Sequence, residues 1–156
     1  MLALSDVFAT IAVLALAAIY GAEVFAMVVL RSALAHVDEP TLSTTMGRIH
    51  QYGDRRLPAF FIVGLVAAIL SGVTAALAGG RAMAVIGVAV LSLLAWLWVF
   101  LRISAPINRR LTAAAVAGRD LPDARDLQQR WDRVIPIRLT LQTLALAALS
   151  VALAMP

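Results

Sequence analysis

Four long apolar runs constrain what this chain can fold into more than any other feature. They occupy residues 7–30, 57–78, 82–101 and 134–155 of the 156-residue sequence. Each run is close to the ~20 residues that an α-helix needs to cross about 30 Å of hydrocarbon. We therefore expect an all-α, polytopic membrane protein, in which residues 1–156 form one domain built as a four-transmembrane-helix bundle.

The composition excludes several other classes of protein. Hydrophobic residues make up 62% of the chain and charged residues 14%, whereas a soluble domain is typically about 45–50% apolar and about 25% charged. A soluble globule, a disordered chain and a nucleic-acid-binding module are therefore not expected. The chain has no cysteine, which excludes disulfides, thiolate catalysis and zinc–cysteine sites. The first run is not expected to be a cleaved signal peptide, because it is too long and follows Asp6 rather than a basic residue.

The arginines predict the orientation of the bundle in the membrane. All 13 cationic residues are arginine. Four lie between the first and second runs and seven between the third and fourth, whereas Arg81 is alone in the turn between the second and third. Because cytoplasmic loops carry an excess of positive charge, both long connections are expected in the cytoplasm. The chain is thus predicted to be a multi-pass protein of the cell inner (plasma) membrane with both termini outside.

The two long connections have the composition of helix extensions rather than of loose loops. Residues 38–40, Asp-Glu-Pro, match a helix N-cap followed by proline in the first turn. A helix is therefore expected to start near residue 41 and to continue through the second run. The third helix should continue past Pro106 until residues 118–122 end it, and Asp123 should open the last helix. The helices would then extend roughly 20 Å into the cytoplasm.

Residues of the four helices can be placed at common heights by counting away from each tight turn. Glu23, Asp54, residues 105–106 and residues 134–135 form one level. One turn outward lie Tyr20, Pro58, Arg102 and Arg138, and one to two turns toward the cytoplasm lie His50 and residues 108–110 and 130–131. These levels together predict a polar layer near the membrane–cytoplasm boundary.

Three prolines fall in the same layer. Pro58, Pro106 and Pro136 lie within about a turn of one another on three different helices. Each removes a backbone donor and tends to kink its helix. Coincident kinks predict that the helices splay here and enclose a polar cavity.

Ionisable and polar side chains also occur at membrane depth. Glu23 lies eight residues, about 12 Å, inside Arg31. A carboxylate at that depth is costly unless it is paired, so a structural pair with Arg138 or Arg55 and a functional role both stay open. Arg138 and Gln142 share one face of the last helix. Two interpretations stay open. Either both side chains line the cavity, or Arg138 reaches the lipid headgroups and Gln142 forms a helix–helix hydrogen bond.

His50 and Asp54 are four residues apart and share a face of the second helix. Together with Glu23 they are candidate ligands of a single divalent metal ion. His50 is also a candidate acid–base group or haem ligand, or an ordinary hydrogen-bonded histidine. The sequence leaves the cofactor open among haem, one divalent metal and none.

Two short segments resemble a known family. Residues 104–111, Ser-Ala-Pro-Ile-Asn-Arg-Arg-Leu, and residues 131–138, Trp-Asp-Arg-Val-Ile-Pro-Ile-Arg, are similar to the anthrone-oxygenase-like family of small four-helix integral membrane proteins, catalogued as a domain of unknown function. The matching positions are Pro106, Asn108, Trp131 and Arg138. Members often carry Asn-His just before that arginine, where this chain has Ile-Pro-Ile. The resemblance implies oxygen-dependent oxidation of a lipophilic aromatic substrate such as an anthrone.

Three hypotheses on function follow. The first is an oxidoreductase or oxygenase acting on a lipophilic aromatic or quinone-like substrate, with Glu23, His50 and Arg138 as catalytic residues. Its substrate-binding residues would be Tyr20, Asn108, Trp131 and Gln142. The alternatives are a non-catalytic subunit of a larger membrane complex and a small proton-coupled transporter of the multidrug type. The expected partners are the lipid bilayer and a lipophilic small molecule, without nucleic acid, and a homo-oligomer or a membrane-complex partner stays open.

Overall fold

The computed structural model describes residues 2–80 and 82–155. The four long helical stretches are α1 (Leu2–Phe25) with η1 (Ala26–Leu30) and α2 (Arg31–Leu34); α3 (Glu39–Leu77); α4 (Ala82–Val99) with η2 (Phe100–Ser104) and α5 (Ala105–Ala117); and α6 (Ala124–Leu153). The described residues contain no β-strand. Each stretch is long and apolar enough to cross a membrane. The predicted all-α, four-helix bundle is confirmed, and the chain is a multi-pass membrane protein.

The start of α3 follows the signal in the sequence. The Asp38 carboxylate accepts a 2.7 Å hydrogen bond from the backbone N–H of Thr41. The backbone N–H of Thr41 favours the charged form and lowers the pKa of the Asp38 carboxyl below its ordinary value. Pro40 occupies the first turn, where a backbone N–H group would have no acceptor within the helix, so the N–H group that proline lacks is not needed there. The helix begins at Glu39, slightly earlier than predicted.

The connection between α5 and α6 combines one expected and one unexpected feature. Gly118 ends α5 in the left-handed conformation, with φ of 60°, which glycine adopts without steric cost. Asp123 precedes α6 as predicted, but its side chain makes no capping hydrogen bond. It instead forms an ion pair of 2.9 Å with Arg110. This contact links the middle of α5 to the residue before α6.

Two π-helical turns interrupt helices that the sequence predicts to be regular. In η1 the backbone N–H of Arg31 bonds to the carbonyl of Ala26, and in η2 the N–H of Ala105 bonds to the carbonyl of Phe100. Pro106, the second residue of α5, cannot donate a hydrogen bond to the preceding turn, which gives a physical reason for the wider turn there. Nothing in the side chains of η1 explains the first one. Such turns are frequent at functional sites.

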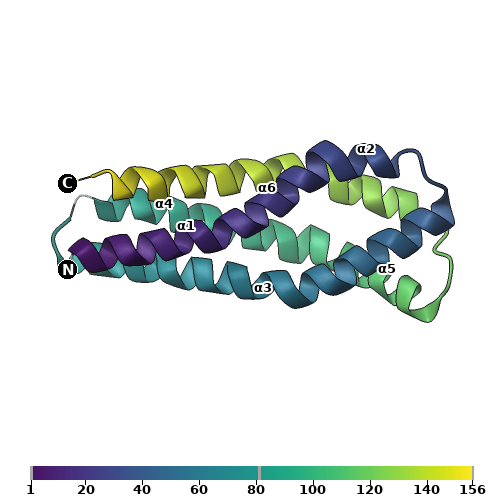
Figure 1. The fold of residues 1–156 in the computed structure, drawn as a ribbon, viewed down its shortest axis with the longest axis horizontal. Coiled ribbons are helices and arrows are strands. Elements are labelled where there is room, and N and C mark those ends of the chain that lie inside the picture. Colours follow the sequence, from purple (N-terminus) through teal and green to yellow (C-terminus); the bar gives the residue numbers. More distant parts are fainter. Residues whose placement is uncertain (1, 81, 156) are drawn as a thin grey trace.

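The four stretches pack as antiparallel neighbours (Figure 1). α1 packs along α3 and α6, and α4 packs along α6 and α3. Both ends of the chain lie at one end of the bundle, and the α2–α3 and α5–α6 connections lie at the other (Figure 1). This arrangement agrees with the predicted pair of helical hairpins.

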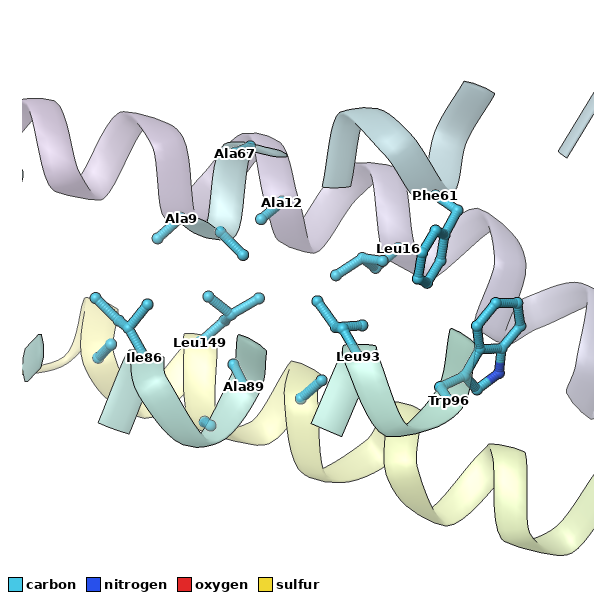
Figure 2. Close-up of a cluster of buried hydrophobic side chains, with 14 of the residues drawn as sticks. Ala9, Ala12, Leu16, Phe61, Ala67, Ile86, Ala89, Leu93, Trp96 and Leu149 are labelled. Carbon is cyan, nitrogen blue, oxygen red and sulfur yellow. The ribbon is translucent and has the colours of Figure 1, made fainter. Parts of the chain in front are cut away.

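The interior contains two apolar clusters. The first fills the half of the bundle nearer the termini, where side chains of α1 and α3 face those of α4 and α6 (Figure 2). In it the Phe61 ring stacks on Trp96, with ring centroids 4.7 Å apart, and Trp96 stacks on Phe100 at 5.4 Å. The second cluster fills the other half and includes Leu42, Met46, Leu111, Leu127 and Ile135. The buried polar residues described below lie between the two.

Glycines of α3 allow close helix packing in both halves. A Cβ atom on Gly64 would lie 2.6 Å from Leu16 Cγ of α1. A Cβ atom on Gly47 would overlap the carbonyl oxygen of Leu111 and the side chain of Ala115 on α5. Because a backbone oxygen cannot move aside as a flexible side chain can, Gly47 fixes the distance between α3 and α5.

The outer surface of the bundle is largely apolar in the half nearer the chain termini. Large hydrophobic side chains such as Leu14, Val63, Leu91, Trp98 and Val151 point outward and are exposed in the isolated chain. A soluble monomer rarely exposes so much contiguous apolar surface. Lipid tails would cover these side chains, which is consistent with four membrane-spanning helices.

Candidate functional site

Arg138 of α6 lies at the centre of a buried polar layer. Its side chain is 1% exposed, and its Nε atom lies 3.1 Å from Glu23 Oε1 of α1 in an ion pair. Its Nη1 atom donates a hydrogen bond to Ser104 Oγ of η2, and the guanidinium carbon lies 4.6 Å from the ring centre of Trp131. One arginine thus joins three of the four helical stretches, at the level of both π-helical turns.

Glu23 is held by this arginine rather than by Arg55. The Glu23 side chain is 7% exposed. Its second carboxylate oxygen, Oε2, is buried and has no hydrogen-bond partner among the residues that the structure describes. Of the two arginine partners that the sequence left open for Glu23, Arg138 rather than Arg55 is the one observed. The free oxygen leaves the carboxylate with capacity for one more donor.

His50 extends the layer toward α3. Its ring lies against Trp131, with ring centroids 5.3 Å apart and planes tilted by 57°. The side chain is buried, and within the described part of the chain neither His50 Nε2 nor Trp131 Nε1 has a hydrogen-bond partner. Trp131 thereby contacts both the imidazole of His50 and the guanidinium of Arg138. The predicted acid–base candidate and the predicted aromatic residue are brought together.

Gln142 continues the layer one helical turn outward on the same face of α6 as Arg138. It is 1% exposed. Neither its amide nitrogen nor its amide oxygen has a partner in residues 2–80 and 82–155. The helix–helix hydrogen bond that the sequence offered as one interpretation is therefore not formed. A buried amide without partners has a donor and an acceptor available for a polar group placed beside it.

The other predicted substrate-binding residues lie at the edges of this layer. Asn108 of α5 donates a 2.9 Å hydrogen bond to Asp54 Oδ1 of α3, so both side chains serve a helix–helix contact. Tyr20 is half-buried, and its hydroxyl accepts a 3.3 Å hydrogen bond from Thr143 Oγ1. Among the described residues, Arg138 forms its hydrogen bond and ion pair with Ser104 and Glu23 rather than with Asn108 or Tyr20. Fewer of the predicted substrate-binding residues therefore lie around Arg138 than the sequence suggested.

The predicted metal ligands are not gathered around one point. No group of three or more histidine, aspartate or glutamate side chains in the described ranges could hold a metal ion. The physical reason is that each predicted ligand faces a different neighbour: Glu23 faces Arg138, His50 faces Trp131 and Asp54 faces Asn108. Trp131 also covers His50, which is 5% exposed. This arrangement fits neither the predicted metal site nor an axial haem ligand with an open face.

The side chains at the centre of the polar layer are almost fully buried. Pro58 and Pro136 lie within helices that continue through them, and Pro106 follows η2. Clefts of about 330 Å³ and 350 Å³ lie nearer the α2–α3 and α5–α6 connections, and neither is lined by Glu23 or Arg138. Neither of these two clefts is the polar cavity that the sequence predicts at Glu23, and that cavity stays a prediction.

Sequence reasoning missed Ser104. This serine is fully buried and bonds to Arg138, yet a serine in an apolar helix is usually a packing residue. Counting from the turn between α5 and α6 puts residue 104 level with residue 138 within about half a helical turn. This common height could have indicated a contact between Ser104 and Arg138. The same counting puts Glu23 level with residues 134–135, whereas its observed partner, Arg138, lies about one helical turn further along α6.

The arrangement has a definite chemical character. A buried cation, a buried carboxylate with a spare oxygen, an imidazole and an amide lie along one path between two apolar clusters. Such groups can stabilise an oxyanion and accept a proton in a buried environment. Comparisons of the chain with models of protein families, with curated proteins and with solved structures find no match.

Proposed function

We propose that the protein is a membrane-bound oxidoreductase of the oxygenase type that acts on a lipophilic aromatic or quinone-like substrate. In this proposal it lies in the inner (plasma) membrane, with the α2–α3 and α5–α6 connections in the cytoplasm. The observation that carries the proposal is the buried Glu23–Arg138 pair beside polar atoms that lack partners among the described residues, in His50 and Gln142. The resemblance of residues 104–111 and 131–138 to the anthrone-oxygenase-like family supports the same class of reaction.

The unpartnered atoms favour a ligand with a carbonyl or hydroxyl group. A buried polar group without a partner costs about 1–3 kcal/mol, so several of them in one layer are unfavourable for structure alone. A carbonyl oxygen could accept from Arg138 or Gln142, and a hydroxyl could donate to Glu23 Oε2. The apolar clusters on either side, including the stacked rings of Phe61 and Trp96, suit the hydrocarbon part of such a molecule.

The reaction can be written for an anthrone, an aromatic ketone with an acidic ring CH₂ group. Glu23 or His50 removes one proton from this group, and the electron pair moves onto the carbonyl oxygen, where Arg138 stabilises the negative charge. The carbanion then reduces dioxygen. One oxygen atom becomes the new carbonyl, the other leaves as water, and anthrone plus O₂ gives anthraquinone plus H₂O. This chain's residues supply the base and the oxyanion stabilisation.

Dioxygen consumption by proteoliposomes supplied with a hydroxyanthrone tests the proposal. We expect Arg138→Gln to lower turnover about a hundredfold or more, as for the loss of one oxyanion donor. Glu23→Gln and His50→Gln separate the two candidate bases, and one of them should lower turnover by a similar factor. Arg102→Gln is the matched control, because Arg102 lies in η2 but is exposed. Unchanged turnover in all three layer variants would overturn the proposal.

The second candidate function is a non-catalytic subunit of a membrane complex. The close packing of the polar layer favours it, because Arg138 and Gln142 leave almost no accessible surface. A stoichiometric membrane partner that co-purifies, together with no turnover of anthrones or quinols, would select this function. Proton-coupled transport ranks third, since Glu23 is held in an ion pair with Arg138. Proton-driven efflux from proteoliposomes that Glu23→Gln abolishes would reverse this order.

A further inference from the structure

The cleft between α2, the start of α3 and α6 has the features of a separate binding site. Its volume is about 330 Å³, within the ~300–1,000 Å³ range of small-molecule sites. Three arginines and one aspartate line it: Arg31, Arg125, Arg133 and Asp132. Leu34 and Leu42 form its apolar wall. None of these residues belongs to the polar layer around Arg138.

The charges in this cleft leave one positive charge uncompensated. Arg125 is neutralised by Glu39, whose Oε1 atom lies 2.9 Å from Arg125 Nε, and it also donates to the carbonyl of Val37 at 2.6 Å. Arg31 and Arg133 then share the cleft with the single carboxylate of Asp132, whose Oδ2 atom lies 3.8 Å from Arg31 Nε. No carboxylate in the described part of the chain pairs with Arg133. A ligand with one negative charge would balance the site.

Gln128 provides an independent sign of a ligand. It lines the cleft and is 5% exposed. Its amide nitrogen donates a 2.8 Å hydrogen bond to Asp132 Oδ1, whereas its amide oxygen has no partner among residues 2–80 and 82–155. The ligand should therefore carry a hydrogen-bond donor, such as a hydroxyl group, next to its negative charge.

The position of the cleft along the helices indicates where this ligand comes from. Arg31 directly follows the apolar run of residues 7–30, and Arg133 directly precedes the run of residues 134–155. Both therefore lie at the depth of the lipid headgroups. Basic pockets between transmembrane helices at this depth bind anionic headgroups, and the planar guanidinium group matches phosphate oxygens in a bidentate way.

We propose that this cleft binds the headgroup of an anionic phospholipid, a phosphodiester that carries a hydroxyl group, as in phosphatidylglycerol. Arg31 and Arg133 contact the phosphodiester, and the Gln128 amide oxygen accepts the hydroxyl. Phosphatidylethanolamine fits less well because its ammonium group cancels the negative charge. The acyl chains run along the apolar surface of the neighbouring helices.

Native mass spectrometry after reconstitution in an equimolar mixture of phosphatidylglycerol, phosphatidylethanolamine and phosphatidylcholine tests this site. We expect the wild-type chain to retain one phosphatidylglycerol molecule. In Arg31→Gln/Arg133→Gln the apparent affinity should fall roughly thirtyfold, from about 1 kcal/mol for each arginine. Arg48→Gln/Arg119→Gln removes the same charge from exposed positions outside the cleft and should bind as the wild type does.

Three results would overturn the proposal. They are an equal loss in the control variant, equal retention of the three lipids, and displacement by glycerophosphoglycerol, the same headgroup without acyl chains, at the concentration at which the lipid binds. The last result would identify a site for a soluble phosphodiester instead. The lipid preference of the wild-type chain decides the question by itself if the double variant fails to fold.

Discussion

At the scale of single residues, Arg138 makes most of the contacts that hold the buried polar layer together. Its charge lies between two apolar clusters and is balanced by Glu23, while Ser104 and Trp131 contact the same guanidinium group. A buried ion pair contributes little compared with apolar residues of the same volume, but the loss of one partner leaves a charge that nothing compensates. The pair therefore makes each of its members hard to replace alone.

A double-mutant cycle tests this coupling. Glu23→Gln and Arg138→Gln should each lower the free energy of unfolding by about 3–5 kcal/mol. The double variant should be more stable than the sum of the two losses predicts, because it contains no unpaired charge. The measurement is equilibrium unfolding in detergent micelles, with Arg102→Gln as the control for the loss of an exposed arginine. Strictly additive losses would show that the two side chains do not depend on each other.

At the scale of elements, α3 determines how closely the helices approach. Gly64 brings it against Leu16 of α1, and Gly47 brings it against the backbone of Leu111 in α5. The two contacts lie on opposite sides of the polar layer along α3. The spacing of the helices around that layer is therefore set from both ends by residues without a side chain.

Gly47→Ala tests this role of α3. The added methyl group would overlap the carbonyl oxygen of Leu111, and we expect a loss of about 1–3 kcal/mol in the free energy of unfolding. Gly53→Ala is the matched control in the same helix, since its Cβ atom would meet only Leu57 Cδ1 at 3.8 Å. That variant should be neutral or more stable by about 0.5–1 kcal/mol, because alanine favours the helix. Similar losses in both variants would contradict the close approach at Gly47.

The elements also mark the limit of prediction from sequence. Apolar length predicted all four helical stretches, and the Asp38 cap and Gly118 marked where α3 begins and where α5 ends. The π-helical turns were not predicted, because η1 contains no residue type that signals them. Proline was recognised as a source of kinks, but the wider turn before Pro106 depends on how the chain relieves a missing donor.

The candidate site was predicted less completely than the fold. Composition and depth identified Glu23, Arg138 and Gln142 as candidate polar residues of the interior, and counting along the helices brought Glu23 and Arg138 within about a turn of each other. The same counting placed His50, Glu23 and Asp54 together as candidate metal ligands, whereas the described residues contain no such group of three side chains. Height along a bundle does not fix the direction of a side chain, and Asp54 turns toward Asn108 instead.

At the scale of the whole molecule, the polar layer divides the bundle into two halves. The half with the chain termini has an apolar interior and an apolar surface, as a membrane requires. The other half extends beyond it and ends in the two helix connections (Figure 1). A lipophilic molecule that reaches the layer from the bilayer would meet Arg138 at the point where the apolar interior ends.

Fluorescence of Trp131 is the most direct test of whether the polar layer is a binding site. In Trp96→Phe/Trp98→Phe the remaining tryptophan, Trp131, lies against Arg138, and in Trp96→Phe/Trp131→Phe it is Trp98, which faces outward. An anthraquinone added to proteoliposomes should quench Trp131 saturably, and Arg138→Gln should weaken this quenching at least tenfold. Trp98 should show only linear quenching by anthraquinone dissolved in the bilayer. Linear quenching of Trp131, unchanged by Arg138→Gln, would contradict a binding site in the polar layer.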